Sequence, residues 1–267
     1  MNLNSKKKYY NYIILVFSIS ICIVTTIFII TFHIKKENDN TTADVPSINP
    51  TSNGSFYLSY INTLSIPDQS TLNDCGAVQI VEILNYYYSS HFSVLALYYY
   101  GRELDGGNGN IGVHITNYFS AINNYGLVSE SDWPYNISNY NVSPPKSVIV
   151  YKPNITVSSF SNKSVISIQN YINNNKVPVL IEINLYSSFK TVNNTGIISI
   201  PNTTSESFIA KHAVSLWGWD NNLKVFIMLN SWGPGSGNNG WYFLPFNYIE
   251  TPSLLGVDGI YNITKII

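Results

Sequence analysis

Residues 230–241 read NSWGPGSGNNGW, and they lie shortly after residues 212–219, which read HAVSLWGW. The first stretch is a glycine-rich turn, and the second is an apolar run typical of a buried strand. Three neighbouring runs share this mixture of β-branched and aromatic residues: VPVLIEINLY (177–186), KVFIMLNSW (224–232) and WYFLPF (241–246). The second half of the chain is therefore predicted to be rich in short strands.

The first half has a helical texture. Ala77–Tyr88 and Ile115–Tyr125 carry apolar residues at helical spacing, and Gly126 supplies a typical stop. A third helix is predicted at Val165–Asn174. Helices followed by strands indicate an α+β fold, which we expect to form two lobes with a cleft between them. We interpret the tyrosine runs at 86–88 and 98–100 as packing and surface residues.

The predicted folded part of the chain contains one thiol. Of the two cysteines, Cys22 lies in an N-terminal apolar run, so Cys75 has no partner for an internal disulfide. A lone cysteine in a hydrophobic chain is usually an inert buried residue. Cys75, however, stands where a helix begins, after Asn73 and Asp74, either of which is able to cap it. The partial positive charge of a helix N-terminus favours the thiolate, which is the nucleophilic form.

A nucleophilic thiol needs further groups around it. His212 is a candidate base, and the amide of Asn230 is a candidate acceptor that would hold the imidazole in its productive tautomer. Trp232 is placed to cover that hydrogen bond. The oxyanion formed on attack needs donors, for which the Cys75 backbone N–H and the Gln69 side chain are candidates.

Five segments, in this order, resemble the papain family of cysteine peptidases over about Ile66 to Tyr248. The cysteine loop is similar to the family's DQ-G-x-C-G-S-C segment with the Gln-to-Cys spacing kept, and the last two segments are similar to its histidine and asparagine blocks. Cys75 and His212 are also separated as the family requires. The segments are DQSTLNDC (68–75), SVLALYYYGRELDGG (93–107), YGLVSESDWPY (125–135), HAVSLWGW (212–219) and NSWGPGSGNNGW (230–241).

The resemblance implies a helical lobe followed by a β-barrel-like lobe. It also implies Cys75 as nucleophile, His212 as general base and acid, Asn230 as the residue that orients the histidine, Gln69 as oxyanion donor and Trp232 as the shield of the His–Asn pair. The implied activity is hydrolysis of peptide bonds through a thioester acyl-enzyme.

Gly106 and Gly107 correspond, by the same resemblance, to the glycine-rich segment that forms one wall of the family's substrate cleft. The resemblance implies that these residues let a substrate backbone approach as an extended strand. Gly109 is an alternative match to the same glycine-rich segment of the family.

Four positions depart from the family pattern. Gly76 replaces the usual Trp after the nucleophile, Leu72 occupies a disulfide position, and Ser236 replaces the second Trp of the asparagine block. These changes resemble the divergent, disulfide-free branch found in bacteria and large DNA viruses. Asp74 is also unusual, because a carboxylate beside the nucleophile raises the thiol pKa unless it faces the helix amides.

Residues 12–34 form an apolar run long enough to span a membrane, and it ends in lysines without a signal-peptidase motif. We expect a single-pass signal anchor with a short cytoplasmic tail (1–11), a flexible stalk (35–56) and a peptidase domain (57–267). Lysine counts on the two sides place the domain in a lumen or outside the cell. Residues 35–68 are too few for a helical prodomain, so no activating cleavage is expected.

Other partners are constrained by the composition. A formal net charge of −1 gives no electrostatic footprint for nucleic acid, and the scattered histidines and single thiol give no metal-ligand spacing. We therefore expect a monomer that acts on polypeptides and needs no cofactor. Two alternatives stay open: a catalytically silent papain-like binding module, favoured by Gly76 and Ser236, and another thiol acyl-transfer enzyme, disfavoured because such enzymes usually pair the histidine with Asp.

Overall fold

The computed structural model describes residues 54–147 and 150–265. The predicted tail, membrane anchor and nearly all of the predicted stalk lie outside these residues. Among the helices of the described part, none is both long and apolar enough to cross a membrane.

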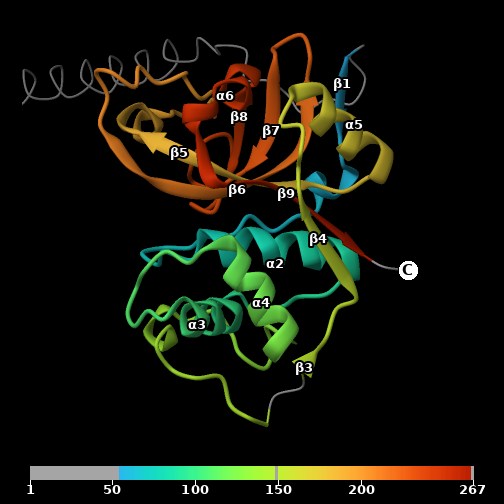
Figure 1. Cartoon of the computed structure of the whole chain (residues 1–267), viewed down its shortest axis with the longest axis vertical. Helices are drawn as coiled ribbons and strands as arrows, with labels where there is room; N and C mark the ends of the chain where they lie inside the picture. The colour runs from blue at the N-terminus through green and yellow to red at the C-terminus, as the bar shows by residue number, and fades with distance from the viewer. Residues whose placement is uncertain (1–53, 148–149, 266–267) are drawn as a thin grey trace, which may run out of the picture. The chain divides into compact units, whose positions relative to one another are not determined.

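Three helices pack together after the first turns of the chain. They are α2 (Cys75–Tyr88), α3 (Val94–Asp105) and α4 (Ile115–Tyr125). Their inward faces form one apolar cluster that includes Ile80, Leu84 and the fully buried Tyr98. Figure 1 shows these helices grouped below the sheet, with α2 next to it.

The second half and the short strand β1 form a seven-stranded antiparallel sheet. Along the main path the order is β4-β9-β5-β6-β7-β8, and β1 also pairs with β6. The strand β1 begins two residues before the predicted start of the domain. The strands are β1 (Ser55–Tyr57), β4 (Ile155–Ser159), β5 (Val179–Tyr186), β6 (Phe208–Asp220), β7 (Val225–Leu229), β8 (Trp241–Pro245) and β9 (Leu255–Lys265).

Smaller elements complete the described chain. Two helices, α5 (Val165–Asn175) and α6 (Phe246–Glu250), accompany the sheet, and β2 (Leu127–Val128) pairs with β3 (Val150–Tyr151). Four short 3-10 turns connect them: η1 (Ser59–Asn62), η2 (Ile137–Asn139), η3 (Ser187–Thr191) and η4 (Pro252–Leu254).

The predicted α+β fold, with a helical part followed by a sheet, is confirmed. A second apolar cluster fills the sheet part and includes Trp217, Phe226 and Tyr242. Leu180 of β5 and Ala213 of β6 belong instead to the helical cluster, so the face of the sheet on which they lie packs against the helices. This meeting of α2 with β6 is what brings Cys75 and His212 together.

Candidate active site

Cys75 is the first residue of α2, as the sequence predicted, and its side chain is partly buried. Its Sγ accepts a hydrogen bond from the backbone N–H of Ala213 at 3.5 Å. Because Ala213 follows His212 directly, the thiol lies beside the candidate base. Burial raises the pKa of the Cys75 thiol to about 11, although the amides of Ala213 and Gly76 act in the opposite direction.

Asp74 does not cap the helix that it precedes. Its side chain is completely buried and makes no capping hydrogen bond; Oδ2 instead accepts a 2.8 Å hydrogen bond from the Tyr135 hydroxyl. Oδ1 has no hydrogen-bond partner among the described residues. Burial raises the pKa of Asp74 to about 7, and its negative charge in turn contributes to the raised pKa of Cys75. The carboxylate therefore opposes thiolate formation, as the sequence had suggested for this orientation.

The imidazole of His212 and the amide of Asn230 are hydrogen-bonded. His212 lies on β6, Asn230 follows β7 directly, and the distance from Nε2 to Oδ1 is 2.7 Å. The other ring nitrogen, Nδ1, is thus left for proton exchange with a nucleophile. The Trp232 ring lies 5.4 Å from the imidazole, measured between centroids, and helps to exclude water. Burial lowers the pKa of His212 to about 4, which keeps the ring neutral.

Gln69 is held by the residue that follows Asn230. Its backbone N–H donates to the Ser231 carbonyl at 2.8 Å, and its Oε1 accepts from the Ser231 hydroxyl. Its Nε2 donates to the Leu72 carbonyl at 2.6 Å, which leaves a second N–H on the same nitrogen. This arrangement fixes the amide in the loop that leads to Cys75.

Gly233 of the asparagine block lies where this block contacts the loop that leads to Cys75. Gly233 has a φ of +76°, and a Cβ there would lie 2.8 Å from the Asp68 carboxylate. Its N–H donates to the Pro67 carbonyl at 3.0 Å. The positive φ and the Asp68 side chain packed against this residue explain why glycine is favoured in this part of NSWG.

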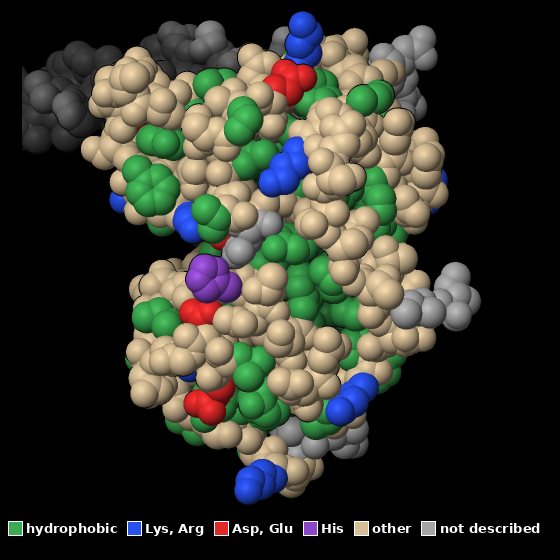
Figure 2. Space-filling model, viewed as in Figure 1, with side chains coloured by type: hydrophobic (Ala, Val, Ile, Leu, Met, Phe, Trp, Pro, Cys, Tyr) green, Lys and Arg blue, Asp and Glu red, His purple; other side chains and the backbone are tan. Residues whose placement is uncertain are grey.

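These side chains share one open cavity of about 560 Å³. Cys75, His212, Gln69 and Trp232 all line it, whereas Asn230 is fully buried and does not. Figure 2 shows that the face in view is notched where the helical and sheet parts meet, with charged side chains scattered singly. An open groove with a thiol and an imidazole in its wall suits an extended chain better than a small enclosed molecule.

The structure does not bring Gly106 and Gly107 to this cavity. Helix α3 continues to Asp105, so Gly106 ends it with a φ of +74°, and a Cβ on Gly107 would run into Ile111. The glycine of this loop that does line the cavity is Gly112, and it also lines the neighbouring pocket. Several glycines follow one another in this loop, and nothing in the sequence singled out Gly112.

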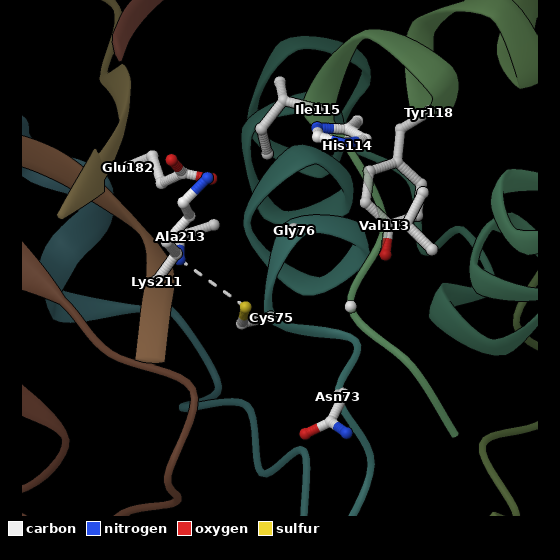
Figure 3. A pocket seen from close by; sticks show the side chains of 11 residues that line it. Asn73, Cys75, Gly76, Val113, His114, Ile115, Tyr118, Glu182, Lys211 and Ala213 are labelled. Atoms are coloured by element: carbon white, nitrogen blue, oxygen red, sulfur yellow. Dashed lines mark hydrogen bonds between the residues drawn. The ribbon is translucent and has the colours of Figure 1, made fainter. Parts of the chain in front are cut away.

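The adjoining pocket, of about 220 Å³, contains residues that the sequence did not point to. It shares Cys75 with the larger cavity and is also lined by Tyr118 of α4 and Glu182 of β5 (Figure 3). A Cβ on Gly76 would meet the ring of Tyr118, with a side-chain carbon 2.5 Å away. The tyrosine thus occupies the space that a large residue after the nucleophile needs, which accounts for Gly76.

Thiol, imidazole, amide and groove together are the groups that thiol hydrolysis requires. Residues 99–250 match the sequence profile described as "Papain family cysteine protease". The match covers more than half of the chain, and the protein belongs to this family of cysteine peptidases. It includes His212 and Asn230 but begins after Cys75, so the nucleophile loop rests on the geometry given above.

Solved structures share the fold. Xylellain, a cysteine protease from Xylella fastidiosa, superposes with a TM-score of 0.72 at 19% identity, covering 85% of this chain and 90% of that one. The Carica candamarcensis protease CMS1MS2 gives a TM-score of 0.57 at 19% identity, with 72% and 89% covered. Procathepsin B S9 from Trypanosoma congolense gives 0.58 at 16% identity, with 85% and 84% covered. No curated protein sequence matches significantly.

Proposed function

We propose that this protein is a membrane-anchored peptidase in which Cys75 attacks the peptide carbonyl, His212 exchanges the proton and Asn230 orients the histidine. The observation that carries the proposal is the 2.7 Å contact between His212 and Asn230, placed beside the thiol that begins α2. The substrate is a polypeptide, as membership of the family implies.

Because Cys75 and His212 both start in their neutral forms, the order of the proton transfers follows. Cys75 starts as a thiol and His212 as an imidazole, so Nδ1 takes the proton as Sγ forms its bond to the carbonyl carbon. The Cys75 N–H, free of an intrahelical acceptor in the first turn, and the Gln69 amide receive the oxyanion. The imidazolium then protonates the leaving amine, and water, deprotonated by His212, hydrolyses the thioester.

A thiol-directed epoxide probe of papain-like enzymes tests this proposal on the full chain in detergent. We expect covalent labelling that is lost in Cys75→Ala and strongly reduced in His212→Ala. His91→Ala removes an exposed histidine and serves as the matched control. Labelling of a folded His212→Ala variant at the wild-type rate would contradict the assignment of the base.

A catalytically silent module is favoured by one observation. Burial acts on both groups in the direction that keeps them uncharged, so a preformed thiolate–imidazolium pair is not favoured. Cleavage of a denatured protein substrate by wild type but not by Cys75→Ala decides for the peptidase. Absence of labelling and of cleavage between pH 5 and 8, with the fold intact, decides for the silent module.

The proposed location follows from the apolar run at residues 12–34. We infer a single-pass anchor that holds a monomeric domain on the lumenal or extracellular side. Resistance of the full chain to alkaline extraction from membranes tests the anchor, and protection of the domain from added protease in sealed vesicles tests its side. Release by alkaline buffer would overturn the anchor.

A further inference from the structure

The small pocket next to the nucleophile contains a carboxylate that the proposed reaction does not use. Glu182 lies on β5, directly opposite Ala213 on β6, and the residue is only 8% exposed. Both side chains line the pocket together with Cys75 (Figure 3). The carboxylate therefore lies within reach of a substrate side chain that enters this pocket.

The strand behind Glu182 leaves room for this carboxylate. Pairing of β5 with β9 shifts register between Ile181 and Ile183, so β9 bulges opposite Glu182. A Cβ on Gly256, in that bulge, would lie 1.9 Å from Oε1 of Glu182. Bulges of this kind often aim side chains at functional sites. Gly256 thus clears the space in which the carboxylate sits.

A second polar group lines the same pocket from the helical side. Tyr118 is fully buried, and its hydroxyl makes no hydrogen bond among the described residues. The rest of the lining includes apolar atoms from Val113, Ile115 and Ala213. A long side chain with an apolar stem and several N–H donors at its end matches this combination.

Two other charged or titratable residues face the pocket. Lys211 is exposed and is the diagonal cross-strand neighbour of Glu182, since Ala213 pairs with Glu182 and Lys211 lies two residues earlier. Figure 3 shows the Lys211 and Glu182 side chains extending toward the same part of the pocket. His114 lines the pocket at the start of α4. Being exposed, the flexible lysine side chain is able to move aside when another cation enters.

We propose that this pocket is a specificity subsite for a basic side chain of the substrate, arginine above all, with the Glu182 carboxylate as its charge partner. The inference rests on the proposed peptidase function, because it names the residue that the same site selects. A planar guanidinium offers five donors and pairs with a carboxylate in a bidentate manner, which favours arginine over lysine.

Occupation of the subsite also acts on the nucleophile. The negative charge of Glu182 contributes to the raised pKa of Cys75. A cation bound to Glu182 offsets that charge, so a basic substrate makes the thiol easier to deprotonate. Selection of the substrate and activation of the thiol are thereby coupled.

The test uses a positional scan with matched peptides. Each peptide has arginine or its neutral isostere citrulline at one position in turn, and kcat/KM is measured with the full chain. We expect a preference for arginine of at least tenfold at one position in wild type, reduced to less than threefold in Glu182→Gln. Glu103→Gln removes an exposed glutamate and keeps the wild-type ratio, while Glu182→Asp retains part of it.

Two outcomes overturn the proposal. One is an arginine-to-citrulline ratio near unity at every position in wild type, and the other is a ratio that Glu182→Gln leaves unchanged. If no peptide is cleaved at all, the proposed function fails, and protection of Cys75 from iodoacetamide by the two peptide series gives the answer. Stronger protection by arginine than by citrulline in wild type, lost in Glu182→Gln, supports the subsite, and equal protection overturns it.

Discussion

The Tyr135 hydroxyl donates a 2.8 Å hydrogen bond to Oδ2 of Asp74, the residue immediately before Cys75. The contact turns the carboxylate away from the helix amides that would otherwise neutralise it. The charge of Asp74 therefore acts on the thiol without a compensating cap, and it raises the pKa of Cys75. Together with burial, Asp74 thus opposes formation of the Cys75 thiolate.

Replacing Asp74 by Asn is expected to make the thiol more acidic. The substitution removes a negative charge next to Sγ, so the pH midpoint of iodoacetamide alkylation moves downward. At a fixed pH between about 8 and the midpoint, where Asp74 is charged in wild type, alkylation is expected to speed up by roughly threefold or more, since one pKa unit corresponds to tenfold. Asp132→Asn, an exposed position with the same change in charge, is the control. An unchanged or raised midpoint in Asp74→Asn contradicts the expectation.

The same carboxylate predicts how stability varies with pH. The pKa of Asp74 rises from 3.8 to about 7 on folding, so the unfolded chain releases its proton first as the pH rises. Its contribution to the free energy of unfolding is thus fully present below pH 4 and is lost between about pH 4 and 7. Urea unfolding measures the free energy of unfolding at pH 5 and at pH 8. The decrease in this free energy from pH 5 to pH 8 is expected to be smaller in Asp74→Asn than in wild type, by on the order of 1 kcal/mol or more. Equal losses would refute this account.

The Asn230 amide is expected to matter for catalysis more than for binding. Asn230→Ala leaves the buried imidazole without its orienting acceptor, so kcat should fall by roughly 10- to 100-fold with a smaller change in KM. Asn173→Ala, at an exposed asparagine, is the control. A variant that changes only KM would assign Asn230 to substrate binding.

Gly76 is expected to tolerate no side chain while Tyr118 is present. Gly76→Ala places a methyl group against the tyrosine ring, and overpacking of this kind costs about 1–3 kcal/mol. Tyr118→Leu alone also destabilises, but the double variant should be more stable than the sum of the two single effects predicts. A thermal-unfolding double-mutant cycle measures this coupling. Strictly additive effects would show that the ring does not set the limit.

Much of the fold could be predicted because the decisive patterns are local. Helix α4 has the predicted bounds, and α2 and α5 differ by a residue or two. Strands β5, β7 and β8 fall within the predicted runs, whereas β6 begins four residues before its run. Helix α3 was not predicted as a helix, because its three consecutive tyrosines obscure the spacing that buries Tyr98 and leaves its neighbours partly exposed. Strand β9 was missed because its glycines and polar residues interrupt any alternation.

The candidate site could likewise be predicted only in part from the sequence. Motif spacing located Cys75, His212, Asn230 and Gln69, whose neighbourhood the structure bears out while their catalytic roles remain predictions. The pocket wall depends on long-range packing: Gly112 lies in a loop with competing glycines, and Glu182 looks like a single polar residue in an apolar strand. Only the register of β5 against β6 and β9 places that carboxylate near the thiol.

The link between Gln69 and Ser231 has a consequence for biosynthesis. It joins positions 162 residues apart and, together with the Gly233–Pro67 hydrogen bond, holds the loop before Cys75 against the block carrying Asn230. A ribosome makes Cys75 long before it makes His212 and Ser231, so the growing chain carries a thiol without its candidate base and a Gln69 amide that Ser231 does not yet hold. Contacts of such long range form late in folding. The cysteine site is therefore incomplete until the segment that carries His212 and Asn230 has been synthesised and has packed against the loop before Cys75.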